Sequence, residues 1–399
     1  MANVSSSNGL EKRPTLRFPG FDEPYKQCRI GDIYAERSQR GASDMELLSV
    51  TMNDGVKPRS EIEGKDNSSE DKSNYKIVRK GDMVYNSMRM WQGANGISPC
   101  DGIVSPAYTV LMPKQEINNG YFAALFKSAN LINEFRKNSQ GMTSDTWNLK
   151  YPQIETIKIQ IPSVSEQDKV SELFGALDAR IVAQAQLVES LKKYKRGVMQ
   201  SIFRHSSQDG WNTVKLGTIF KKVSRRNTNG GIKNVITNSA EYGLIPQRDF
   251  FDKDIAVDGN TSNYYVIDEG DFVYNPRKSN TAPYGPFNRY TLKEKGIISP
   301  LYTCLVLQAD INPAYLAWYF KSDAWYRYIY DNGSQGVRHD RVSMTDDLLM
   351  GIPVSFPVIS KQRKIAELLD AIEYRQSVTQ SEYDMMIKLR NGFMQQLFT

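Results

Sequence analysis

Two tetrapeptides in this sequence come close to a motif of catalytic chemistry. Ser105-Pro-Ala-Tyr108 and Ser299-Pro-Leu-Tyr302 resemble the Asn/Asp/Ser-Pro-Pro-Tyr motif with which amino-methyltransferases hold a target amine, but the second proline is absent from both. The sequence also has no Gly-x-Gly loop that could take a cofactor. We therefore interpret both tetrapeptides as entries to β-strands.

Other catalytic chemistries find equally little support. Glu63-Gly-Lys65 resembles the end of a nuclease carboxylate-lysine motif, but no Pro-Asp precedes it, and no P-loop is present. The only histidines are His205 and His339, and the three cysteines lie far apart, which argues against histidine-based catalysis and zinc binding. The sequence thus predicts no catalytic residue, no metal site and no cofactor.

The composition is that of a folded protein with more than one core. Its 399 residues, 40% of them hydrophobic, exceed the ~250 to 300 residues at which single cores stop growing. The net charge of +6 is spread thinly along the chain, so local clusters must carry any argument for nucleic-acid binding. No apolar run is long enough for a membrane span and no signal peptide is apparent, so we expect a cytoplasmic protein.

The chain matches itself at an offset that drifts from about 186 to about 195 residues. The matching pairs of segments are 25–34 with 211–220, 81–86 with 270–275, 102–109 with 296–303, 121–128 with 315–322, 139–141 with 334–336, and 197–203 with 392–398. Residues 35–80 and 87–101 share no pattern with their counterparts, 221–268 and 276–295. This contrast predicts one scaffold with two different reading surfaces, although neutral drift of loops is an alternative.

Two long helices are expected from residues 165 and 360, where helix formers run without proline to the end of each repeat. Apolar residues recur at heptad a and d positions in a narrow stripe, which favours a mutual antiparallel coiled coil over two ordinary core helices. Polar residues interrupt the middle of this seam. The seam residues are Phe174, Leu177, Ile181 and Gln184 in the first helix, and Leu369, Ile372, Gln376 and Thr379 in the second.

The rest of each repeat predicts an α/β (α+β) unit, giving two tandem units separated by the helices. Short strands are expected at 82–85, 108–112, 271–274 and 302–307, and one aromatic-rich helix per unit at 121–137 and 315–330. The predicted divisions are a tail at 1–20, a first unit at 21–164, a helix at 165–205, a second unit at 206–358 and a second helix at 359–399.

Residues suited to reading DNA gather in the divergent loops and beside the Ser-Gln-Gly turns. Arginine can bond the major-groove edge of guanine, asparagine or glutamine that of adenine, and lysine holds phosphates. The candidates in the first unit are Arg37, Arg40, Arg89 and Gln92, and those in the second are Arg225, Arg226, Arg277, Lys278, Arg338, His339 and Arg341. A solvated surface charge is the alternative for each residue taken alone.

These features together resemble one family, the specificity subunit (HsdS) of type I restriction-modification systems. The resemblance covers residues 16–399 and rests on the repeated Gly-Asp-x-Val-Tyr-Asn and Ile-Val/Ile-Ser-Pro-x-Tyr segments, the Ser-Gln-Gly turns, and the Pro-x-x-Ser-x-Gln starts and Met-Gln-x-Ile/Leu-Phe ends of the helices. It implies two target recognition domains that bind double-stranded DNA, each reading one half of a bipartite site.

The resemblance also implies partners. Two modification (methyltransferase) subunits would carry the S-adenosylmethionine site and methylate adenine, and restriction (motor-nuclease) subunits can join to cleave. A fused methyltransferase is an alternative that would need several hundred more residues. A DNA-recognition adaptor for a different methyltransferase or anti-phage complex would have the same sequence signature.

Overall fold

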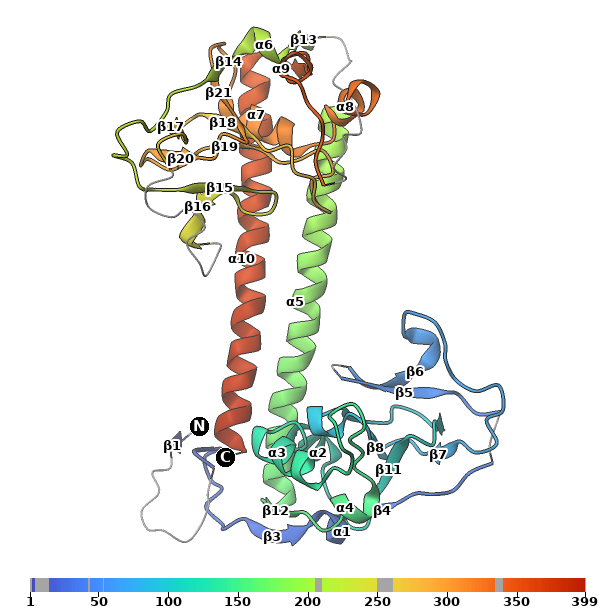
Figure 1. Ribbon diagram of the computed structural model, residues 1–399. Helices are drawn as coiled ribbons and strands as arrows, with labels where there is room; N and C mark the ends of the chain where they lie inside the picture. Colours follow the sequence, from blue (N-terminus) through green and yellow to red (C-terminus); the bar gives the residue numbers. More distant parts are fainter. Residues whose placement is uncertain are drawn as a thin grey trace. The chain divides into compact units, whose positions relative to one another are not determined.

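The computed structural model describes residues 2–3, 14–41, 44–52, 54–204, 210–249, 261–333 and 340–398. The chain divides into two compact units, which we describe separately: unit 1 comprises Met1–Gln186 with Ser381–Thr399, and unit 2 comprises Leu187–Gln380. Each unit contains a globular α/β part and a segment of both long helices, α5 (Val164–Arg204) and α10 (Ile359–Leu397) (Figure 1).

The globular part of unit 1 is built from short strands and helices. These are β1 (Ala2–Asn3), β2 (Leu16–Arg17), β3 (Lys26–Arg29), α1 (Ile30–Ile33), β4 (Tyr34–Glu36), β5 (Leu48–Thr51), β6 (Gly55–Pro58), η1 (Arg59–Glu61), β7 (Lys76–Val78), β8 (Met83–Asn86), η2 (Met90–Gln92), β9 (Asn95–Ile97), β10 (Gly102–Val104), β11 (Tyr108–Pro113), α2 (Asn119–Leu125), α3 (Ala129–Asn138), α4 (Tyr151–Ile154) and β12 (Lys158–Ile161). Its main sheet is antiparallel in the order β4-β11-β8-β9.

Unit 2 repeats this topology. Its elements are β13 (Asn212–Lys215), α6 (Leu216–Ile219), β14 (Phe220–Val223), β15 (Ile236–Ser239), β16 (Gly243–Pro246), η3 (Gln247–Asp249), β17 (Tyr265–Ile267), β18 (Phe272–Tyr274), β19 (Phe287–Arg289), β20 (Gly296–Ile298), β21 (Thr303–Leu307), α7 (Pro313–Lys321), α8 (Tyr326–Asn332), α9 (Asp346–Met350) and β22 (Pro353–Phe356). The sheet order β14-β21-β18-β19 corresponds to the order β4-β11-β8-β9 of unit 1. The strand pairs β13–β22, β17–β20 and β15–β16 likewise correspond to β3–β12, β7–β10 and β5–β6. The sequence repeat is therefore a repeat of the fold.

One of the two inner strands of each sheet, β8 in unit 1 and β18 in unit 2, is apolar on both faces because both faces are covered. In β8, Met83 and Tyr85 pack with α2 and α3, whereas Val84 packs with the strands β5, β6, β7 and β10. In β18, Phe272 and Val273 divide in the same way between two cores. Continuous apolar runs are typical of strands buried on both sides, which explains the Met-Val-Tyr and Phe-Val-Tyr segments of the repeat.

One glutamine in each unit ties the start of a long helix to the globular part. Gln167 of α5 donates to the carbonyl of Pro162 at 3.1 Å and accepts from the backbone N–H of Asn118 at 3.0 Å. Gln362 of α10 makes the equivalent two contacts in unit 2, both at 2.8 Å. These hydrogen bonds account for the glutamine of the Pro-x-x-Ser-x-Gln segments.

The two long helices contact each other within each unit. In unit 1, Asp178 pairs with Arg390, and Gln184 donates to Glu382 at 2.9 Å. Because the residue number rises in α5 as it falls in α10, these helix segments are antiparallel. In unit 2, Lys195 of α5 pairs with Glu373 of α10.

The predicted seam residues are buried or half-buried. The buried ones are Phe174, Leu369, Ile372 and Thr379, and the half-buried ones are Leu177, Ile181, Gln184 and Gln376. Gln184 bonds Glu382, and the hydroxyl of Thr379 donates to the carbonyl of Arg375 at 2.8 Å. The side-chain oxygen of Gln376 is buried and has no hydrogen-bond partner among the described residues.

The prediction of one aromatic-rich helix per unit is wrong, because each expected helix is two helices. In unit 1, Ser128 has an extended backbone between α2 and α3, and its hydroxyl accepts from the N–H of Leu131 at 3.4 Å, which starts α3 anew. In unit 2, Ser322 is likewise extended after α7. The two Ser-Pro-x-Tyr tetrapeptides are confirmed as strand entries: Tyr108 begins β11 and Tyr302 directly precedes β21.

Candidate functional site

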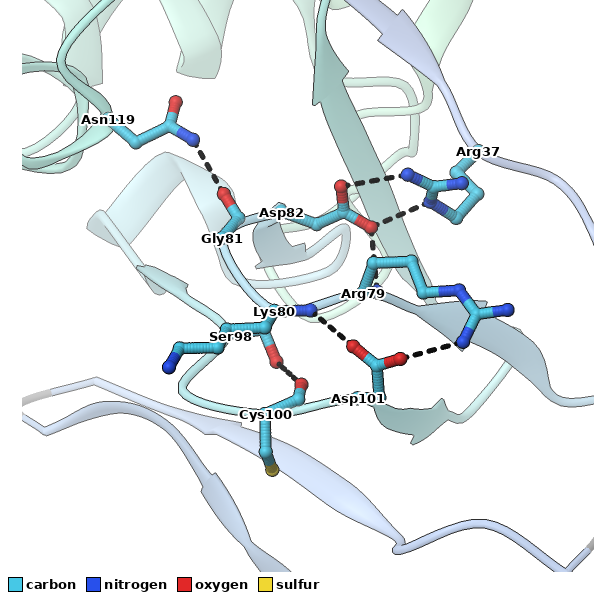
Figure 2. A network of polar contacts seen from close by, with 9 residues as sticks. All are labelled: Arg37, Arg79, Lys80, Gly81, Asp82, Ser98, Cys100, Asp101 and Asn119. Carbon is cyan, nitrogen blue, oxygen red and sulfur yellow. Dashed lines mark hydrogen bonds and ion pairs between the residues drawn. The ribbon is translucent and has the colours of Figure 1, made fainter.

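In unit 1, Asp82 of the Gly-Asp-x-Val-Tyr-Asn motif is a buried hydrogen-bond acceptor. Its carboxylate accepts from Nε and Nη2 of Arg37 at 2.6 and 3.1 Å, and from the backbone N–H of Arg79 at 2.8 Å (Figure 2). The hydrogen bond to Asp82 raises the pKa of Arg37. Arg37, a predicted DNA contact, thus has its guanidinium engaged inside the protein, where it ties β4 to the turn before β8.

The same turn has a second acidic brace. Asp101, before β10, pairs with the guanidinium of Arg79 at 2.7 Å and accepts from the backbone N–H of Lys80 at 2.8 Å (Figure 2). These two hydrogen bonds lower the pKa of Asp101, that of Lys80 being the larger cause. From the other side, the Asn119 side chain donates to the carbonyl of Gly81. The turn of the motif is therefore held by contacts from three directions.

In unit 2, Asp271 holds the equivalent position with a looser partner. It accepts from the backbone N–H of Asp268 at 2.9 Å and from Nη2 of Arg225 at 3.2 Å, and Arg225 also pairs with Asp268 at 2.7 Å. The Arg225 side chain is 53% exposed, against 22% for Arg37. Burial raises the pKa of Asp271, and its hydrogen bonds offset this only in part.

The asparagine that ends the motif shapes the turn that follows. The Asn86 side chain accepts from the backbone N–H of Met88, and that of Asn275 accepts from the N–H of Arg277, both at 3.0 Å. Such Asx turns redirect the chain after a strand. The next residue of each turn accepts a backbone hydrogen bond from a distant segment: Leu149 N–H to the Ser87 carbonyl at 2.8 Å in unit 1, and Val342 N–H to the Pro276 carbonyl at 2.9 Å in unit 2.

We call the resulting surfaces the first edge (residues 87–92 and 147–149) and the second edge (residues 276–278 and 340–342). The second edge gathers three predicted cations, Arg277, Lys278 and Arg341. Lys278 donates its backbone N–H to the carbonyl of Asp340 at 2.9 Å, and the Asp340 carboxylate lies 3.8 and 3.9 Å from Nε of Arg277 and Arg341. Arg338 and His339, also predicted, lie outside the described residues.

The second edge extends to the Ser-Pro-Leu-Tyr segment. Burial raises the pKa of Tyr302, while the positive charges of Arg277 and Arg341 act to lower it. The Arg277 side chain is 68% exposed. This edge therefore presents an exposed arginine whose charge acts on a half-buried tyrosine, an arrangement suited to a polyanion.

The first edge has a different chemistry on the same frame. Arg89 is half-buried and Gln92 exposed, and between them Trp91 packs edge-on against Trp147 with ring centroids 5.1 Å apart. The guanidinium of Arg136, from α3, lies 5.3 Å from the centre of the Trp147 ring. The edge thus combines two tryptophans with few charges.

Two remaining candidates lie apart from the edges. Arg40 is exposed and forms an isolated backbone bridge with Lys76. Arg226 is exposed, bonds the side-chain oxygen of Asn263 at 3.2 Å and lies over the Tyr265 ring, 5.5 Å from its centre. The structure therefore brings together Arg89 with Gln92, and Arg277 with Lys278 and Arg341. Arg37 and Arg225 instead form ion pairs with aspartates of their own unit.

Sequence reasoning missed Trp147 and Arg136. Both lie in segments that the repeat analysis assigned to the scaffold or left between matches, and their contact with Trp91 joins residues far apart in the chain. The Ser-Gln-Gly turn could have indicated Trp147, because this turn starts the segment that returns to the first edge. Its backbone pairing, Gln140 with Asn148, shows why such a turn precedes Trp147.

No cluster of three or more His, Cys, Asp or Glu side chains suited to holding a metal ion occurs in the described part of the chain. Within the same residues, no helix combines the length and apolar character needed to cross a membrane.

Comparisons with known proteins agree with this geometry. Residues 23–193 match the family model of the type I restriction modification DNA specificity domain. The specificity subunit of the type I restriction enzyme StySPI from Salmonella potsdam is 25% identical over 184 residues, which is 41% of this chain and 38% of that protein. The matched region thus spans well under half of this curated relative.

Solved structures match the fold over almost the whole chain. The HsdS subunit from Thermoanaerobacter tengcongensis aligns over 96% of this chain and 97% of its own, with a TM-score of 0.50 and 16% identity. This chain therefore shares its fold with a solved type I specificity subunit. A second solved structure, the type I restriction-modification S subunit from M. genitalium, aligns over 97% of this chain and 99% of its own, with a TM-score of 0.55 and 13% identity. The fold of this chain, with two tandem α/β units and two long helices, is therefore that of these solved subunits.

Proposed function

We propose that this chain is the DNA-reading specificity subunit of a type I restriction-modification complex. In this proposal it binds double-stranded DNA and recognises a bipartite target, one half-site per unit. The observation that carries the proposal is the pair of edges: both units build the same turn with the same backbone hydrogen bonds, yet place different side chains on it. A protein with one task would have no need of two chemistries on one frame.

Base reading is assigned to the edges and not to the internal ion pairs. Arg277 and Arg341 have the fork geometry that bonds guanine, Gln92 can bond adenine, and Lys278 and Arg89 suit phosphates. Arg40 and Arg226 are exposed and suit phosphates outside the edges. We assign Arg37 and Arg225 a positioning role, because each holds the aspartate that fixes the turn.

Catalysis is assigned to partner subunits. Two modification subunits would bring S-adenosylmethionine and methylate adenine, and restriction subunits would cleave, so this chain itself is not an enzyme. The long helices leave large apolar side chains exposed, among them Val182 and Leu187 on α5 and Leu368 and Tyr374 on α10. We propose that the partner subunits cover part of this helix surface. Since the target is cellular or invading DNA, we place its action in the cytoplasm.

We propose that the chain has five parts. An N-terminal tail at 1–20 precedes two recognition domains at 21–164 and 206–358, which are followed by helical spacers at 165–205 and 359–399, respectively.

The test is methylation-sensitive sequencing of DNA from a host that expresses this chain with its modification subunit. A bipartite adenine-methylated motif that appears only when both proteins are present is expected. Methylation of a single continuous motif, or methylation that does not depend on this chain, would contradict the proposal.

A further inference from the structure

A loop beside the first edge, closed by backbone hydrogen bonds, holds one methionine entirely in solvent. Residues 139–148 are closed by two backbone hydrogen bonds between Gln140 and Asn148, at 3.0 and 2.8 Å. Inside the loop, the backbone N–H groups of Thr146 and Trp147 both donate to the carbonyl of Thr143, at 2.9 and 3.1 Å. These bonds fix the loop without any help from the Met142 side chain, which is 100% exposed.

The glycine before Met142 is required by the loop. Gly141 has φ +142, and a Cβ at this position would lie 2.6 Å from the carbonyl oxygen of Thr146. The other end of the loop is anchored to α3, because the hydroxyl of Ser139 donates to the carbonyl of Phe135 at 2.7 Å. The Ser-Gln-Gly segment therefore serves to project the residue that follows it.

The surroundings of Met142 favour DNA as its contact. The loop returns through Trp147, which packs on Trp91 and lies under the guanidinium of Arg136. Of the acidic groups nearby, Glu134 is paired with Lys137 at 2.7 Å, and Asp145 is exposed in the loop itself. An apolar tip with two tryptophans and an arginine behind it matches nucleic acid, in which the apolar faces of the bases lie between charged phosphates.

We propose that Met142 is an apolar probe that contacts the bases of the first half-site and inserts against a base step. Proteins that deform DNA use methionine, leucine, isoleucine or phenylalanine in this way, and arginines hold the flanking phosphates. The inference rests on the proposed function and adds a specificity determinant to it. In the sequence of unit 2, Val337 follows the matching Ser-Gln-Gly segment, so an apolar residue stands at the same place in both repeats.

The experiment uses the full chain and a duplex that carries the methylated motif, with 2-aminopurine placed in turn at each position of the first half-site. Met142→Ala should lower affinity for this duplex about 10-fold, which corresponds to ~1.4 kcal/mol, and should abolish the rise in 2-aminopurine fluorescence at one step. Met142→Leu should retain most of the affinity, and Met142→Gln should not, because the contact is apolar. The matched control is Met52→Ala, which removes another exposed methionine of unit 1.

Each outcome has a separate meaning. If wild type binds the motif but Met142→Ala binds it equally well with the same fluorescence, Met142 has no role and the proposed function stands. If wild type does not prefer the motif over a scrambled duplex, the proposed function itself fails. A duplex in which only the first half-site is scrambled should bind wild type and Met142→Ala equally, which shows that the variant is folded and keeps its second half-site. Unequal binding to that duplex would overturn the assignment of Met142 to the first half-site.

Discussion

The first and second edges share a frame and differ in almost everything that faces solvent. In both, an aspartate fixes the turn before the inner strand (β8 or β18), and an asparagine redirects the chain after that strand. A returning segment then donates a backbone hydrogen bond. On this frame the first edge places two tryptophans and a glutamine, and the second places two arginines and a lysine. The repeat motif therefore encodes the position of a reading surface and leaves its chemistry open.

The difference has an energetic counterpart. Contacts between cations and phosphates release counterions and so weaken steeply with salt, whereas aromatic stacking and apolar contact do not. We expect the second half-site to be bound with strong salt dependence and the first with weak salt dependence.

The largest effect is expected from exchanging an entire unit. Replacing residues 206–358 with the corresponding segment of another specificity-family chain should change one half of the methylated motif completely and leave the other half intact, because each edge is built within one unit. Methylation-sensitive sequencing is the measurement. A change in both halves would show that reading is shared between the units.

Removing the charges of the second edge should be the next largest effect. With Arg277, Lys278 and Arg341 all replaced by Ala, affinity should fall about 100-fold near 150 mM salt, and the slope of log K against log salt should fall by about 2 to 3. Trp147→Ala in the first edge is the matched change and should weaken binding about 10-fold without altering the slope. Fluorescence anisotropy across a salt series measures both. Equal changes of slope would remove the distinction between the edges.

Removing the aspartate that fixes the turn should lower the stability of unit 1 more than that of unit 2. Asp82→Ala leaves the largely buried Arg37 without its partner and should lower the free energy of unfolding by about 2 kcal/mol. Asp271→Ala should cost about 1 kcal/mol, because Arg225 is more exposed and keeps Asp268. Urea denaturation gives the values, and hydrogen exchange in β8 and β18 locates the loss. A greater cost in unit 2 would contradict this account.

The seam of the helices offers a change that should stabilise the protein. Gln376 has a buried oxygen without a partner among the described residues, and the repeat places Ile181 at the equivalent position of α5. Gln376→Ile should therefore raise the free energy of unfolding by about 1 kcal/mol. Gln184→Ile is the control and should not stabilise, because Gln184 bonds Glu382. Thermal denaturation of both variants decides the matter.

The smallest effect concerns pH. Burial raises the pKa of Asp271 above its ordinary value of 3.8, so the folded state holds this proton more tightly than the unfolded state does. The stability from the protonated group is fully present below the ordinary pKa and is lost as pH rises through the raised one. Asp271→Asn should flatten this part of the stability curve, measured by urea denaturation between pH 3.5 and 6. An unchanged curve would mean that Asp271 ionises normally.

Much of the fold could be predicted because the chain contains its own comparison. The repeat identified β8 and β18 within a residue or two, and the apolar heptads and absence of proline identified α5 and α10. The breaks at Ser128 and Ser322 were missed, because the aromatic periodicity continues across them while the backbone does not. At Ser128, the capping hydroxyl overrides the hydrophobic pattern at a single residue.

The candidate site was predictable only in part. The basic residues at 277, 278 and 341 could be named from their loops, and their assembly required only one backbone pairing. In sequence, Arg37 and Arg225 resemble the arginines of the second edge. In the structure they pair with Asp82 and Asp271, which lie far from them in the chain. Charge type is written in the sequence, but whether a charge is already engaged depends on contacts between distant segments.

The ion pairs between the long helices have a consequence for ancestry. Asp178 of α5 lies one repeat before Glu373 of α10, and Lys195 lies one repeat before Arg390. In unit 1, Asp178 of α5 pairs with Arg390 of α10. In unit 2, the residues at the equivalent repeat positions, Glu373 of α10 and Lys195 of α5, form the same pair with the two helices exchanged. Each helix thus carries both halves of a self-complementary contact, as two identical chains related by a two-fold axis must. The simplest history is a shorter gene whose product paired with itself, followed by duplication and fusion, after which the first and second edges were free to diverge separately.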